Sequence, residues 1–136
     1  MIDNDDYSIH FDNNIMIVVY KCKILNLEIA KNIIRDRVRL SKNQDQFIFV
    51  DSLKIGYWTS ESRSFMGKKE NLAFIASSAI LIKSPLLMNL LSWFLSMFSV
   101  SSPTKFFKGK DEAIAWLIAQ QKKPNHSQRN YKMTKI

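Results

Sequence analysis

The sequence predicts an α/β fold in which helices cover a mostly parallel sheet. One observation is the element order, because strand-like and helix-like segments follow one another as ββαβαβαβα. A second is the stretch 72–100, whose only charge is Lys83. Its first part, 76–82, is short and partly β-branched, as in a strand buried on both faces. Residues 86–98 lack β-branched side chains and are rich in Leu, Met and Phe, as in a helix.

The first two strands form a predicted hairpin. Tyr7, Ile9 and Phe11 alternate with polar residues, which predicts a strand with one buried face. Residues 12–14 favour a turn, because Asn and Asp tolerate left-handed backbone conformations, and 15–20 form a continuous apolar run. We expect two antiparallel strands joined by this turn.

A helix is predicted over 27–41, with Asn26 as its N-cap. Arg35, Arg37 and Arg39 are spread around this helix, so we expect all three to be solvent-exposed rather than to bind a phosphate. The expected apolar face comprises Leu27, Ala30, Ile33, Ile34 and Val38.

The middle of the chain predicts a third buried strand at 47–50 and a short helix after it. Thr59, Ser60 and Ser62 compete as caps of that helix. Gly67 can end it.

The C-terminal part predicts a short strand at 104–107, placed at a sheet edge because a proline precedes it. Gly109 can cap a last helix that frays near Lys122 and carries acidic residues in its first turn. The residues expected to bury this helix are Ala113, Ile114, Trp116, Leu117 and Ile118.

The predicted helix 86–98 is unusually apolar. It would be roughly 20 Å long, short of the roughly 30 Å hydrocarbon core of a bilayer, so we expect no transmembrane helix. Such a helix is buried in the core, forms a self-association or partner surface, or meets a membrane surface. Its narrow polar stripe comprises Asn89, Ser92, Ser96 and Ser99. The candidate interaction surface comprises Leu90, Trp93, Phe94 and Met97.

Composition bounds the domain organisation and location. The 136 residues carry a formal net charge of +8, but a run of basic residues without any acid follows Gln121. The basicity therefore belongs mostly to the tail, and no specific nucleic-acid partner is expected. We predict a disordered N-terminus at 1–6, one domain at 7–121 and a flexible basic tail at 122–136. The single cysteine, Cys22, and the acidic N-terminus suggest a cytoplasmic location.

Motifs of catalysis are not found in the sequence. It has no glycine-rich phosphate loop, no nucleophile elbow and no metalloprotease motif. His10 and His126 stand in an outward strand position and in the tail, so we expect neither a catalytic triad nor a zinc site. Lys21 and Lys23 could lower the thiol pKa of Cys22, but we interpret it as an unreactive thiol. We therefore expect no enzyme activity, no cofactor and no metal.

A family resemblance rests on the C-terminal block. Pro103-Thr104-Lys105-Phe106-Phe107, followed by Glu112-Ala113-Ile114-Ala115-Trp116-Leu117, resembles the C-terminal signature of small bacterial STAS-like proteins, also called SpoIIAA-like or STAS/Sec14-like. The resemblance covers about residues 7–119 and includes the strand that ends at Asp51. It implies a four- to five-stranded mixed sheet covered by helices.

The resemblance also implies a function. Sporulation-type STAS proteins bind a kinase partner and carry a phosphorylatable Ser at the start of the helix after the third strand. Here that helix begins several residues after Asp51, so Thr59, Ser60 or Ser62 would be the phosphoacceptor, although capping alone explains them. The implied function is a noncatalytic interaction or regulatory module with an unknown protein partner, or a homodimer. The alternative is a Sec14-like domain that binds a lipid or a small hydrophobic ligand and contacts membranes peripherally.

Overall fold

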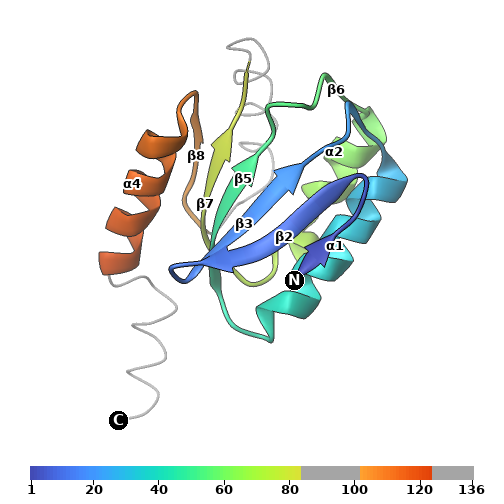
Figure 1. The fold of residues 1–136 in the computed structure, drawn as a ribbon. Helices are drawn as coiled ribbons and strands as arrows, with labels where there is room; N and C mark the ends of the chain where they lie inside the picture. The colour runs from blue at the N-terminus through green and yellow to red at the C-terminus, as the bar shows by residue number, and fades with distance from the viewer. Residues whose placement is uncertain (84–101, 124–136) are drawn as a thin grey trace.

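The computed structural model describes residues 1–83 and 102–123 (Figure 1). Its main sheet has six strands in the order β1-β2-β3-β5-β7-β8. β1, β2 and β3 pair antiparallel, whereas β3, β5, β7 and β8 run parallel. These strands are β1 (Ile2–Asp3), β2 (Tyr7–Asp12), β3 (Ile15–Tyr20), β5 (Gln46–Asp51), β7 (Ile75–Leu81) and β8 (Thr104–Phe107). A small parallel sheet pairs β4 (Ile24–Leu25) with β6 (Tyr57–Trp58).

Helices cover both faces of the main sheet, so the domain has three layers (Figure 1). On one side, which we call the α1 face, lie α1 (Leu27–Ser41), α2 (Ser60–Met66) and the 3-10 helix η1 (Lys69–Leu72). On the other side, the α4 face, lies α4 (Lys110–Lys122).

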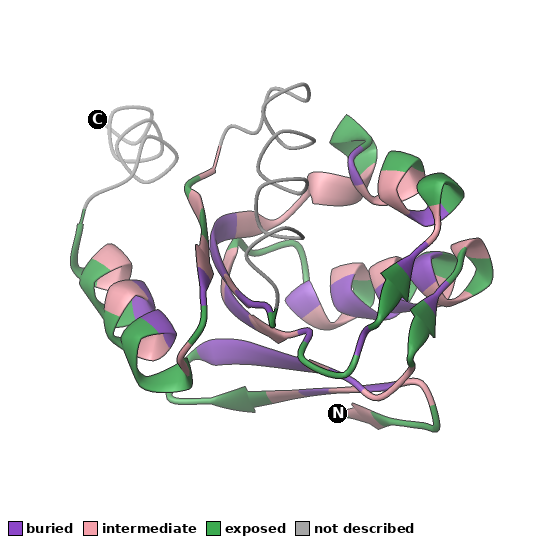
Figure 2. Ribbon diagram, turned by 90° about the horizontal axis from the view of Figure 1, so that it is seen from above, coloured by how far each residue is buried: buried purple, intermediate pink, exposed green. Residues whose placement is uncertain are grey.

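Each central strand supplies side chains to both layers of the core. In β3, Met16, Val18 and Tyr20 pack on the α1 face, whereas Ile15 and Ile17 pack on the α4 face. Successive side chains of a strand point to opposite faces, so a strand covered on both sides must be apolar throughout. Figure 2 shows the resulting burial, with β3 buried along its length and the helices buried on the sides turned to the sheet.

The predicted architecture is confirmed. The hairpin pairs Tyr7 with Tyr20, and β8 lies at an edge of the sheet. The side-chain oxygen of Asn26 accepts a hydrogen bond from the Ile29 amide (2.9 Å), which fixes the start of α1. Strands cover the segments predicted at 7–11, 15–20, 47–50, 76–82 and 104–107 to within a residue. The helix predicted at 86–98 lies outside the described residues.

The N-terminus differs from the expected disorder over residues 1–6. Ile2 and Asp3 form β1, in which Ile2 pairs with Ile9 of β2. The Asn4 side chain accepts hydrogen bonds from the Asp6 and Tyr7 amides (2.9 Å each). These local bonds order a segment whose composition alone gives it little to bury.

Two apolar side chains are more exposed than predicted. Phe11 is 46% exposed, because burial in β2 is confined to its first half. Ile118 is 42% exposed, because α4 presents one narrow stripe to the sheet, centred on Ala113 and Leu117. The tail beyond Lys123 lies outside the described residues.

Candidate functional site

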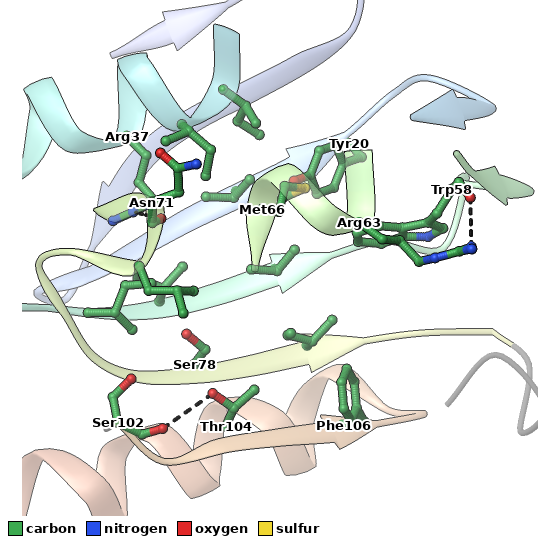
Figure 3. A pocket seen from close by; sticks show the side chains of 18 residues that line it. Tyr20, Arg37, Trp58, Arg63, Met66, Asn71, Ser78, Ser102, Thr104 and Phe106 are labelled. Atoms are coloured by element: carbon green, nitrogen blue, oxygen red, sulfur yellow. Dashed lines mark hydrogen bonds between the residues drawn. The ribbon is translucent and has the colours of Figure 1, made fainter. Parts of the chain in front are cut away.

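A cavity of about 140 Å³ lies on the α1 face, between the helices and the central strands (Figure 3). α1, α2 and η1 line it from one side, and β3, β5, β7 and β8 line it from the other. The strand contributions follow period two, because alternate residues of a strand share one face. These pairs are Val18 and Tyr20, Ile48 and Val50, Ser78 and Ile80, and Thr104 and Phe106.

The wall of the cavity is almost entirely apolar, with a few polar groups at defined places. Ile33 and Ile34 of α1 and Met66 of α2 close it opposite the sheet. Small-molecule sites are usually apolar concavities with a few placed polar groups, so this arrangement is suited to a ligand.

Arg37 is the first of these polar groups, and its position corrects the expectation that it is solvent-exposed. The residue is only 5% exposed, and its guanidinium donates to the carbonyls of Ala73 (2.9 Å) and Asn71 (2.8 Å). Burial lowers the pKa of Arg37 to about 10, with the nearby Tyr20 acting in the opposite direction, so the group stays charged at neutral pH.

A sequence signal for this burial was present. Ala30, Ile33, Arg37 and Ser41 recur at spacings of three and four, and all four are buried. Arg37 therefore lies on the buried face of α1. The burial of its three neighbours on that face predicts that its side chain points toward the sheet. Charge alone does not predict exposure, because a long side chain can reach backbone carbonyls across the core.

The Arg63 guanidinium and the indole N–H of Trp58 are the next polar groups near the cavity. Arg63 Nη1 donates to the Trp58 carbonyl (2.8 Å), and Figure 3 shows the two side chains side by side. Trp58 is 7% exposed and stacks obliquely on Tyr20, with ring centroids 6.1 Å apart. Its indole Nε1 is buried and has no hydrogen-bond partner among the described residues.

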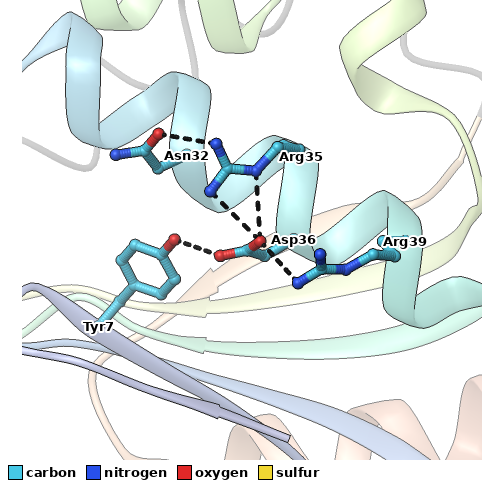
Figure 4. A network of polar contacts seen from close by, with 5 residues as sticks. All are labelled: Tyr7, Asn32, Arg35, Asp36 and Arg39. Atoms are coloured by element: carbon cyan, nitrogen blue, oxygen red, sulfur yellow. Dashed lines mark hydrogen bonds and ion pairs between the residues drawn. The ribbon is translucent and has the colours of Figure 1, made fainter.

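A separate polar network ties β2 to α1 (Figure 4). Tyr7 Oη donates to Asp36 Oδ2 (2.5 Å), and Arg39 and Arg35 reach Asp36 Oδ1 at 3.2 and 3.4 Å. Asp36 is buried, whereas the two arginine side chains are exposed. Burial, followed by the hydrogen bond and charge of Asp36, raises the pKa of Tyr7 to about 12. Both carboxylate oxygens of Asp36 have protein partners, so we interpret the network as structural.

The predicted phosphoacceptor residues cluster at the start of α2. Thr59 is the N-cap, and its Oγ1 accepts a hydrogen bond from the Ser62 amide (3.1 Å). The Ser62 hydroxyl is fully buried and donates to the Thr59 carbonyl (2.7 Å), whereas Ser60 is exposed. This geometry accounts for capping, and modification at these positions stays a prediction. Leu90, Trp93, Phe94 and Met97 lie outside the described residues.

Cys22, metal binding and membrane crossing are the other chemical possibilities within residues 1–83 and 102–123. Burial raises the thiol pKa of Cys22, opposite to the lowering that its lysine neighbours could produce. The described residues contain no group of acidic, histidine or cysteine side chains arranged to hold a metal ion. In the same part of the chain, every helix is too short or too polar to cross a bilayer.

Comparisons with known proteins give a family and a fold. The family model described as a domain of unknown function, DUF7793, matches residues 8–121. A crystal structure from Shewanella loihica PV-4, an uncharacterized protein of the DUF3478 family with a SpoIIAA-like fold, superposes with a TM-score of 0.61 at 14% identity. The match covers 86% of this chain and 98% of that chain, which confirms the SpoIIAA-like fold. No curated protein matches the sequence significantly.

Proposed function

We propose that this chain, which belongs to the family of the domain of unknown function DUF7793, is a noncatalytic STAS-like interaction module that binds a protein partner or a second copy of itself. The observation that carries the proposal is the SpoIIAA-like fold, which extends over most of the chain. That fold agrees with the family resemblance of the C-terminal block, and the resemblance implies binding rather than catalysis. The expected cytoplasmic location remains part of this proposal.

The proposed contact surface comprises Leu90, Trp93, Phe94 and Met97, in the connection between β7 and β8. The support comes from sequence. Apolar residues surround most of the circumference of the predicted helix 86–98, and a helix lying on a sheet buries only about half of its surface. Proteins rarely leave a large apolar patch in water, so the remainder fits a partner or a second copy.

Sedimentation velocity across micromolar concentrations tests this proposal. We expect the parent to associate and Trp93→Glu to stay monomeric, because a charge in an apolar contact lacks a partner. Tyr57→Glu is the matched control, since Tyr57 is an aromatic side chain that is 58% exposed and belongs to β6 rather than to the segment 86–98. A parent protein that sediments as a monomer at every concentration would rule out self-association. An equal loss of association in both variants would contradict the assignment of the contact to this surface.

A second candidate function is binding of a small hydrophobic ligand. The cavity on the α1 face specifically favours it, because the cavity is apolar and its described walls come from eight different elements.

A further inference from the structure

We propose that the cavity on the α1 face binds a small carboxylate with an apolar body. This inference deepens the second candidate function, on which it rests, by naming the class of ligand. The described residues that line the cavity are different from the residues of the proposed interaction surface. The carboxylate would lie beside Arg63 and the indole Nε1 of Trp58, and the apolar body would lie against Met66, Ile80 and Phe106.

The size of the cavity sets the size of the ligand. Its volume is about 140 Å³. An engineered apolar cavity of roughly 150 Å³ holds a benzene molecule, so the part of the ligand that lies inside this partly open cavity has only about six to ten non-hydrogen atoms. This range includes hexanoate and benzoate, and it is far below a phospholipid.

The charges around the cavity indicate that the ligand is negatively charged. Two arginines, Arg37 and Arg63, line it, and none of its described lining residues is acidic. Within the described residues, both guanidinium groups donate to backbone carbonyls, and neither has an ion-pair partner. Arg37 is buried and Arg63 is partly buried. A cation removed from water without an anion is costly, so an anionic ligand gains attraction that a neutral ligand lacks.

The orphaned indole supplies a directional group. Trp58 is only 7% exposed, and its Nε1–H lacks an acceptor among the described residues. Leaving a buried donor unpaired costs free energy, and a carboxylate oxygen that displaces the side chains covering Nε1 would satisfy it. The hydrogen bond from Arg63 to the Trp58 carbonyl holds the guanidinium beside the same residue. A carboxylate in this corner would accept from both.

A carboxylate fits these groups better than a phosphate does. The cavity has little polar surface, and the described donors around Trp58 suffice for two oxygens rather than for a dianion with three. A monoanion also carries the smaller desolvation cost into an apolar cavity.

Calorimetric titration of the full chain with hexanoate and with 1-hexanol tests the proposal, because the two probes share a chain and differ in charge. We expect hexanoate to bind at least about tenfold more tightly than 1-hexanol, as for a charge-assisted hydrogen bond. Arg63→Met should remove about that tenfold advantage and leave 1-hexanol binding unchanged. Lys54→Met, which removes an exposed charge outside the cavity lining, should change neither.

A spectroscopic readout locates the binding. In an amide and indole NMR spectrum, Trp58→Phe identifies the Trp58 indole N–H signal by its loss. Hexanoate should shift that signal in the parent, and 1-hexanol should shift it less. Hexanoate that binds without moving this signal, or equal affinities for the two probes, would overturn the proposal. So would undetectable hexanoate binding by the folded parent. Sedimentation of the same sample reports on the interaction module separately.

Discussion

The two faces of the sheet differ in how they are packed and in the charges that they bury. On the α4 face, Ala79, Ala113 and Leu117 are completely buried in an apolar cluster. On the α1 face, the larger apolar cluster surrounds a cavity and is accompanied by two buried charged residues, Asp36 and Arg37. Buried charge and empty space both cost stability. In the described part of the chain, the α4 face is therefore the more uniformly apolar one, and the proposed ligand site lies on the α1 face.

Side-chain size explains part of this difference. Alanines at 79 and 113 let α4 approach the sheet closely, and Phe107 and Trp116 pack at its rim with ring centroids 5.8 Å apart. The α1 face is instead covered by three helical pieces from separate parts of the chain. Their side chains converge around a space that the described residues leave open.

The largest expected effect is on the α4 face. Leu117→Ala should lower the free energy of unfolding by about 2–5 kcal/mol, because a close-packed site cannot collapse around the lost atoms. Met66→Ala, beside the cavity, should cost clearly less, since its side chain already borders empty space. Urea unfolding of both variants measures the difference. Equal costs would contradict the contrast between the faces.

A smaller effect is expected at the network that anchors β2 to α1. Tyr7→Phe should cost about 1–2 kcal/mol near pH 7, because it removes one hydrogen bond to a buried carboxylate that keeps its arginine partners. The folded-state pKa of Tyr7 is raised to about 12 from an unfolded value of about 10. Its stabilising contribution is therefore complete below pH 10 and is lost as the pH rises towards 12.

The pH dependence gives this prediction its control. Phe cannot ionise, so the stability difference between parent and Tyr7→Phe should shrink between about pH 10 and pH 12. Tyr20 and Arg37 also titrate in the alkaline range and are present in both proteins, so only the charge coupling of Tyr20 with Tyr7, the smallest cause of the raised Tyr20 pKa, differs between them. Thermal unfolding at a series of alkaline pH values measures it. A constant difference across this range would refute the assigned role of the hydroxyl.

The sequence predicted the elements well and the candidate site poorly, for physical reasons. Strand alternation and the Asn26 cap are local signals, and they located the hairpin and α1. The cavity depends on how α1, α2 and η1 meet over the sheet, which is a tertiary property. Arg37 combines a local signal with a tertiary one. Its spacing from Ile33 is local and predicts burial, whereas its carbonyl partners lie 34 and 36 residues away in the sequence and cannot be predicted from the local pattern.

The smallest effect should differ in sign between the two faces. Ser78 of β7 lines the cavity, whereas the adjacent Ser77 is buried on the opposite side of the same strand. Ser78→Val should raise the free energy of unfolding by about 0.5–1 kcal/mol, because it fills empty space and suits a strand. Ser77→Val should lower it by about 1–3 kcal/mol, because Ser77 is buried on the face of the fully buried Ala79, where a larger side chain must displace its neighbours. The stabilised Ser78→Val should also bind hexanoate more weakly than the parent, since the added methyl groups occupy the ligand's volume. Parallel urea unfolding and hexanoate titration of both variants decide the matter, and a Ser78→Val protein that is less stable than the parent would show that the cavity has no space to fill.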